Sequence, residues 1–170
     1  MTGDVPVVAG TEVSADVDIA ATPERVWDLV SDISLMPQLS GELQSVRWDE
    51  GFDGPALGAQ FLGTNRNESI GEWTTRSHIV AFERPRLFGW AVSDPENPVA
   101  TWAFSLEPTD RGTRLTFTVR LGPGQSGLTM LMRRSPERAQ EILQRRLGQF
   151  RASLQATVDG LRDRAEGLSR

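Results

Sequence analysis

The stretch EVSADVDIAATPERVWDLVSD, residues 12–32, decides the fold because a strand pattern runs directly into a helix pattern, with no linker between them. In its first half, apolar residues alternate with Glu, Ser and Asp, which is the two-residue period of a half-buried strand. Thr22 then offers a capping oxygen, Pro23 fits the first helical position, and Glu24 complements the helix dipole. We therefore expect a short amphipathic helix carrying Trp27 directly after the first strand.

The sequence after this unit predicts a meander of strands. Pro37 and Gly41 limit any second helical turn near Asp32, so we expect two short helices between the first strand and the rest of the sheet. Six segments rich in β-branched and aromatic residues follow, separated by Gly, Pro and Asp: residues 43–48, 59–65, 72–83, 87–92, 99–106 and 112–122. With the first strand they predict a seven-stranded, curved antiparallel sheet.

The chain ends in a predicted long amphipathic helix. Apolar residues between Ile142 and Leu161 recur at helical spacing. Ser135 and Pro136 repeat the start chemistry of Thr22 and its neighbour, so we expect Ser135 to cap this helix. Strands and helices do not alternate as a parallel sheet requires, so the predicted fold class is α+β. A twisted sheet holding one helix leaves part of its concave face uncovered, and we expect an apolar cavity there.

The composition disfavours several partners. The 18 basic and 23 acidic residues give a net charge of -5, which disfavours binding to nucleic acid. No apolar run is long enough to cross a bilayer and residues 1–10 do not resemble a secretory signal, so we expect no integral membrane segment and a cytoplasmic location. With neither linker nor repeat, we expect one domain over residues 1–170, its ordered core at 12–164, as a monomer or homodimer.

Missing residue types exclude many chemistries. The sequence has no cysteine, tyrosine or lysine, and His78 is its single histidine. Thiolate nucleophiles, lysine Schiff bases, tyrosine acids and multi-histidine metal sites are therefore excluded, and we expect neither metal nor cofactor. His78 shares the strand parity of Glu72 and Arg76, which predicts the outer face of the sheet unless a bulge turns it inward.

Several phrases of the sequence resemble the START-like, polyketide cyclase/dehydrase and lipid transport superfamily (SRPBCC). They are TPERVWDLVSDISLMPQ, GAQFLGTNR, GEWTTRSHIVAFERPRLFGWAV, TWAFSLEP and GTRLTFTV, within residues 13–161. The resemblance implies the helix-grip fold shared with the birch-pollen allergen, in which the sheet wraps around the C-terminal helix. Similar proteins include lipid binders, hormone receptors, aromatases, cyclases and chaperone-assisting domains, so the resemblance is more specific for fold than for function.

The candidate ligand contacts share inward strand parity or lie on the covering helices. The aromatic candidates are Phe61, Trp73, Phe88, Trp90, Trp102, Phe104 and Phe117. Asn65, Thr75 and Ser77 share the parity of Trp73 and are expected to orient a ligand carbonyl or hydroxyl. Met130 and Leu147 complete the set from the helical segments. The alternative for the aromatic residues is plain core packing, and for the polar residues bonding to the backbone or to one another.

Three functions are open at this point. The first is binding or transport of a hydrophobic or amphipathic small molecule, lipid-like or polyketide-like, in the cavity. The second is a polyketide aromatase or cyclase, which the missing tyrosine and the turn position of Glu68 and Glu72 disfavour. The third is a partner-binding domain without a small ligand. It would use the Met- and Arg-rich residues 128–134, also a candidate gate, or the six arginines between Arg133 and Arg151.

Overall fold

The structure is a computed structural model and describes residues 5–168. Its elements, in chain order, are β1 (Glu12–Ile19), α1 (Pro23–Val30), the 3-10 turn η1 (Ile33–Leu35), α2 (Met36–Leu39), β2 (Leu43–Trp48), β3 (Gln60–Asn67), β4 (Gly71–Glu83), β5 (Leu87–Val92), β6 (Ala100–Thr109), β7 (Gly112–Leu121), α3 (Gly127–Arg134), the 3-10 turn η2 (Pro136–Arg138) and α4 (Ala139–Ala165). The seven predicted strands and the long final helix are confirmed.

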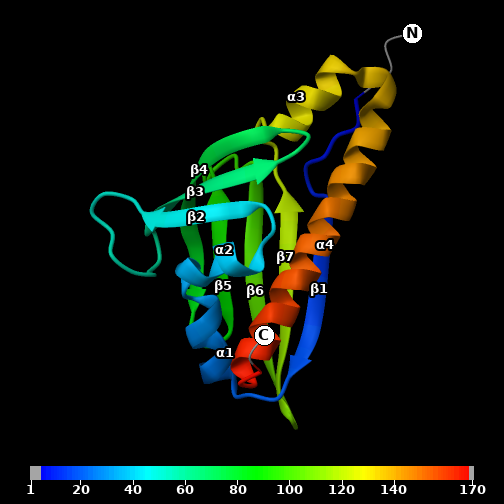
Figure 1. Cartoon of the computed structure of the whole chain (residues 1–170). Coiled ribbons are helices and arrows are strands. Elements are labelled where there is room, and N and C mark those ends of the chain that lie inside the picture. The colour runs from blue at the N-terminus through cyan, green and yellow to red at the C-terminus, as the bar shows by residue number, and fades with distance from the viewer. Residues whose placement is uncertain (1–4, 169–170) are drawn as a thin grey trace.

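The strands form one antiparallel sheet in the order β1-β7-β6-β5-β4-β3-β2. Consecutive strands from β2 to β7 pair as a meander, and β1 pairs with β7 from residue 12 to residue 19. The 27-residue helix α4 crosses the concave face close to β1, while α1 and α2 lie over the lower part of the same face, near β5 (Figure 1). This arrangement is the expected helix-grip fold.

The first helix starts where the sequence predicts. The Thr22 side chain accepts a hydrogen bond from the Arg25 backbone N–H at 3.3 Å, and Pro23 occupies the first turn of α1. The predicted second short helix is α2, in which Pro37 lies within the first turn and is therefore compatible with the helix. Local capping chemistry thus turns the chain from β1 into a helix that packs on the concave face of the sheet.

The final helical segment begins at Pro136 as predicted, but its first turn is a 3-10 turn and the predicted capping bond of Ser135 is missing. Ser135 makes no capping hydrogen bond with its side chain, and α4 begins at Ala139 after a 3-10 turn. Ser126 and Thr129 form a capping box that starts a separate helix, α3, over the Met- and Arg-rich segment. The backbone N–H of Ser135 donates to the carbonyl of Leu131, so Ser135 ends α3. The sequence pattern of a helix start was present, but the preceding helix uses that residue.

One half of the concave face is closely packed. We call it the filled half, and it is defined by Trp27, Phe82, Phe88 and Phe104. Trp27 of α1 packs edge-on against Phe82 and Phe88, with ring centroids 5.4 and 6.1 Å apart. Phe88 and Phe104 have no exposed surface, and Trp27 is 2% exposed. Helix α1 therefore closes this half of the sheet, and the indole of Trp27 is its largest buried group.

Candidate functional site: a cavity between α4 and the sheet

The other half of the concave face holds a cavity of about 310 Å³, which we call the open half. Its wall is mainly apolar and draws on the strands, on the helices and on the chain segments that join them. We define the open half by four aromatic residues of this wall, Phe61, Trp90, Trp102 and Phe150. The wall also includes the apolar residues Val8, Ile33, Met36, Leu43, Ile70, Val92, Val99, Leu121 and Leu128. Its volume lies at the lower end of the range common for small-molecule sites.

Aromatic rings form one continuous wall of the cavity. Trp90 and Trp102 are directly paired on β5 and β6, and their rings stack with centroids 6.5 Å apart and planes 12° apart. Phe61 lies edge-on to Trp90 at 6.0 Å. From the opposite side, Phe150 of α4 lies edge-on to Trp102 at 5.6 Å. The wall therefore offers both flat faces and ring edges to a bound molecule.

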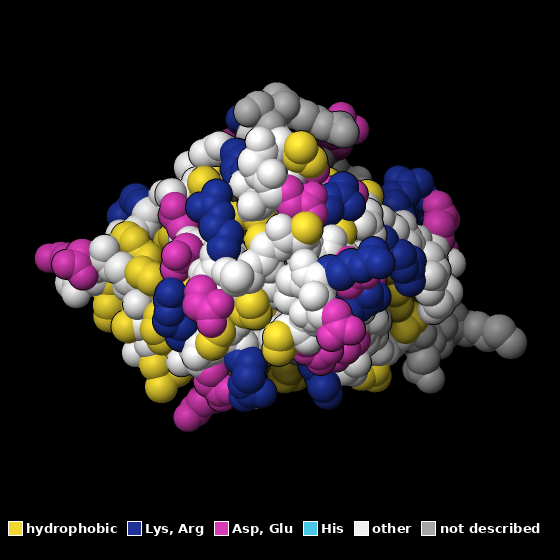
Figure 2. Space-filling model, turned by 90° about the horizontal axis from the view of Figure 1, so that it is seen from below, with side chains coloured by type: hydrophobic (Ala, Val, Ile, Leu, Met, Phe, Trp, Pro, Cys, Tyr) yellow, Lys and Arg dark blue, Asp and Glu magenta, His cyan; other side chains and the backbone are white. Residues whose placement is uncertain are grey.

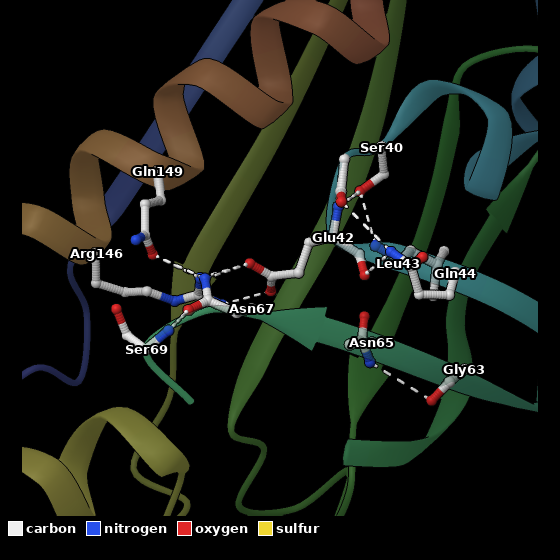
Figure 3. Close-up of polar contacts among 11 residues, drawn as sticks. Ser40, Glu42, Leu43, Gln44, Gly63, Asn65, Asn67, Ser69, Arg146 and Gln149 are labelled. Atoms are coloured by element: carbon white, nitrogen blue, oxygen red, sulfur yellow. Dashed lines mark hydrogen bonds and ion pairs between the residues drawn. The ribbon is translucent and has the colours of Figure 1, made fainter. Parts of the chain in front are cut away.

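The predicted polar residues lie at this wall. Asn65, Thr75 and Ser77 all line the cavity, as does Trp73. Asn65 donates a long hydrogen bond of 3.5 Å from Nδ2 to the Gly63 carbonyl (Figure 3). The hydroxyls of Thr75 and Ser77 have no hydrogen-bond partner within residues 5–168. In the same residues, every side-chain polar atom that is fully buried has a hydrogen-bond partner, so these two hydroxyls are not fully buried. These hydroxyls therefore reach the cavity space and are available to a ligand.

The remaining predicted contacts divide between the cavity wall and other places. Phe117 lines the cavity and stacks on Phe104 at 4.0 Å, so it marks the boundary between the two halves. Phe88 and Phe104 lie in the filled half and do not line the cavity. Met130 is 41% exposed on α3, and Leu147 is buried on a face of α4 that does not line the cavity.

The cavity wall also contains an ion pair, Glu42 with Arg146, that the sequence did not predict. The Arg146 guanidinium donates to both carboxylate oxygens of Glu42, each at 2.6 Å, in bidentate geometry (Figure 3). Gln149 accepts from Arg146 at 3.0 Å, and Asn67 donates to Glu42 at 3.2 Å. The guanidinium carbon lies 4.3 Å from the ring centroid of Phe150. The Arg146 side chain is only 10% exposed, so this pair is largely screened from water.

The sequence contained a signal for Arg146. Arg146, Phe150, Ser153 and Thr157 recur at intervals of four, three and four residues, which places them on one face of α4, and all four line the cavity. The apolar stripe of Leu143, Leu147 and Leu154 lies beside it and fills the core. Counting the six arginines between Arg133 and Arg151 places Arg146 in the predicted partner-binding set, because a count ignores the helical phase of each residue. Glu42 has no comparable periodic signal.

Other ionisable candidates lie away from the cavity. His78 pairs with Gln60 and Ala91 and does not line the cavity. The irregularity in β4 comes after it, between Ile79 and Ala81, so the parity prediction for His78 holds. Glu68 and Glu72 are exposed at the β3–β4 turn. Within the described chain, no group of three or more histidine, aspartate or glutamate residues could hold a metal ion.

Several surface charges are paired. Arg114 donates to Asp16 and Asp18, which raises the pKa of its guanidinium. The backbone N–H of Glu50 and the guanidinium of Arg76 lower the pKa of Asp49. Acidic and basic side chains are interspersed over the lower end of the molecule (Figure 2). In residues 5–168 no helix combines the length and apolarity needed to cross a bilayer.

The fold and the cavity define a helix-grip domain with an aromatic-lined internal site. The family described as polyketide cyclase / dehydrase and lipid transport matches residues 10–166, and the chain belongs to it. No curated protein matches the chain significantly.

A solved structure at 31% identity supports the same assignment. The Polyketide_cyc-like protein Cgl2372 from Corynebacterium glutamicum is 31% identical, with a TM-score of 0.62 and 91% of each chain covered. The Zhui aromatase/cyclase from Streptomyces sp. R1128 is 17% identical, with a TM-score of 0.66 and coverage of 92% of this chain and 93% of its own. The second likeness shows the shared fold alone.

Proposed function

We propose that the protein binds a hydrophobic or amphipathic small molecule in the open half of the concave face. The observation that carries this proposal is an aromatic-lined cavity of about 310 Å³ directly beside a half that is closely packed. Protein interiors normally leave few voids larger than a water molecule, so a space of this size requires a function or a stability cost. A ligand that buries apolar surface there gains roughly 25 cal/mol for each Å² removed from water.

The polar groups support binding and orientation. Thr75 and Ser77 present hydroxyls to the cavity, and Asn65 presents an amide. A few such groups at an apolar wall fix the orientation of a ligand whose affinity comes mainly from apolar burial. The lipid-like and polyketide-like ligands expected from the sequence both fit this distribution.

A cyclase or dehydrase reaction is the second candidate. The family description and the aromatase/cyclase neighbour favour it, and Glu42 places one carboxylate at the cavity wall. That carboxylate is held in a bidentate ion pair, and His78 lies outside the cavity. General acid–base catalysis needs a group free to exchange a proton with the substrate. Binding without turnover is therefore the function we favour.

A matched pair of variants tests the proposal. Thr75 lines the cavity, whereas its neighbour Thr74 is exposed on the opposite face of β4. The neutral fluorescent probe N-phenyl-1-naphthylamine should bind the native protein, and Thr75→Trp should weaken binding at least about tenfold by filling the cavity. Thr74→Trp should leave binding unchanged. Circular dichroism checks that both variants fold, and equal binding by the two variants would contradict the proposal.

A further inference from the structure

The Glu42–Arg146 pair is the only charged part of the described cavity wall. Its two members are held very differently. Arg146 projects from the first third of α4, donates to Gln149 and lies over the ring of Phe150. Glu42 lies on the short connection between α2 and β2, and its carboxylate contacts Arg146 and Asn67. Arg146 is thus the fixed member of the pair and Glu42 the movable one.

The exposures of the two side chains agree with this difference. The Glu42 side chain is 23% exposed and has a route to solvent, whereas Arg146 is 10% exposed. Rotation of Glu42 outward would return its carboxylate to water. Arg146 would keep Gln149 and Phe150 but would lose its charge partner, and a buried guanidinium without a counter-ion is strongly unfavourable. An open cavity with Glu42 outside therefore requires another anion at Arg146.

We propose that Arg146 is a carboxylate-binding subsite that Glu42 occupies in the absence of ligand, and that the ligand is an amphipathic carboxylic acid. The ligand carboxylate would take both positions that the Glu42 oxygens now hold, 2.6 Å from the guanidinium nitrogens. Its apolar part would lie against Phe150 and Trp102. The exchange keeps one anion beside one cation in the cavity, so the charge of the wall is conserved.

This inference rests on the proposed function and deepens it. The chain's own carboxylate acts as a competitor, so the protein would select ligands by combining a carboxylate with enough apolar surface to displace Glu42. A neutral ligand of the same shape leaves the ion pair closed and has no use for Arg146. The acid and its ester should therefore respond in different ways to a change at Glu42.

The test compares 1-naphthaleneacetate with its methyl ester on native protein and Glu42→Gln, by isothermal titration calorimetry at pH 7. Glu42→Gln removes the competing charge, so the acid should bind at least about tenfold more tightly, with little change for the ester. Glu141→Gln is the matched control. It removes a carboxylate that pairs with Arg138 on the same helical segment, away from the cavity wall. This control should change neither affinity.

Glu42→Gln leaves Arg146 buried without its charge partner, so a second variant removes both charges. Glu42→Met combined with Arg146→Met removes both members and should fold, because an apolar pair of similar volume is often neutral for stability. This double variant should lose the preference for the acid over the ester. Equal affinities of Glu42→Gln and native protein for the acid, or an equal gain for the ester, would overturn the inference. Failure of every variant and the native protein to bind either compound and the neutral probe would instead overturn the proposed function.

Discussion

The filled and open halves of the concave face are built on the same strands. Strand β5 contributes Phe88 to the filled half and Trp90 to the open half, and β6 contributes Phe104 and Trp102 in the same way. Phe88 and Phe104 are fully buried, whereas Trp90 and Trp102 remain partly accessible at the cavity. In each pair the two residues lie two positions apart. The sheet itself therefore does not decide where the cavity lies.

The helices that cover the sheet decide where the cavity lies. Over the filled half, α1 packs the buried indole of Trp27 against Phe82 and Phe88 of the sheet. Over the open half, α4 presents Arg146, Phe150, Ser153 and Thr157, of which only Phe150 is large and apolar. A helix with short or charged side chains at these positions cannot fill the space above the sheet. The comparison shows that the cavity is a property of the helix face.

The largest expected effect is a difference in the free energy of unfolding between substitutions in the filled half and in the open half. Phe104→Ala should lower the free energy of unfolding by about 3–5 kcal/mol, because it opens a void in a packed region that cannot collapse. Trp102→Ala, on the same strand, should cost clearly less, because its ring already borders empty space. Urea unfolding monitored by circular dichroism measures both changes. Equal losses would show that the two halves are packed alike.

A second comparison adds volume to each half. Val30→Phe in the filled half should destabilise the protein by roughly 1–3 kcal/mol through overpacking, since Val30 is completely buried. Ser77→Leu in the open half should be tolerated, because the added carbons enter the cavity. The same substitution should weaken binding of N-phenyl-1-naphthylamine. Thermal unfolding and a probe titration report the two effects, and strong destabilisation by Ser77→Leu would argue against free space beside residue 77.

The sequence predicted the open half only in part. Strand alternation correctly brought Asn65, Thr75 and Ser77 to one face, because a two-residue period leaves no other choice within a regular strand. The same rule does not distinguish Phe104 from Trp102, since both face inward and only the cover above them differs. Sequence periodicity gives the side of a sheet, but the depth of packing depends on which distant helix lies above it.

The helices show the same limit. The cap at Thr22 was predictable because it depends on three adjacent residues. The ion pair of Glu42 and Arg146 joins residues 104 positions apart and was not predictable from either neighbourhood. Ser135 had the right chemistry to cap α4 but ends α3. Local chemistry was therefore a reliable guide where no other element competed for the residue.

A smaller effect sharpens the open half as a binding site. Asn65→Leu should weaken binding of methyl 1-naphthaleneacetate about fivefold to tenfold, because the amide is available to a ligand carbonyl. Thr64→Leu is the matched control, since Thr64 bonds to Thr74 away from the cavity. Calorimetric titration of both variants measures the difference. Unchanged binding by Asn65→Leu would remove Asn65 from the ligand contacts.

The smallest expected effect lies outside both halves. The pKa of Asp49 is lowered by the backbone N–H of Glu50 and by Arg76, so its contribution to stability is present above the ordinary aspartate pKa of about 4. That contribution should be lost as the pH falls below this value, through the folded-state pKa. Asp49→Asn should therefore lose less stability than native protein between pH 5 and pH 2.5, measured by urea unfolding. Identical pH profiles would show that Asp49 contributes nothing.

The two terminal strands of the sheet have a consequence for how the protein behaves at high concentration. Strand β1 lies under α4, whereas β2 ends the opposite edge. An uncovered edge invites a strand from another molecule and so promotes aggregation. Strand β2 is only six residues long, its register is irregular between Leu43 and Ser45, and it carries the exposed charge of Arg47. These features discourage intermolecular strand addition at the edge strand that contributes Leu43 and Val46 to the cavity wall.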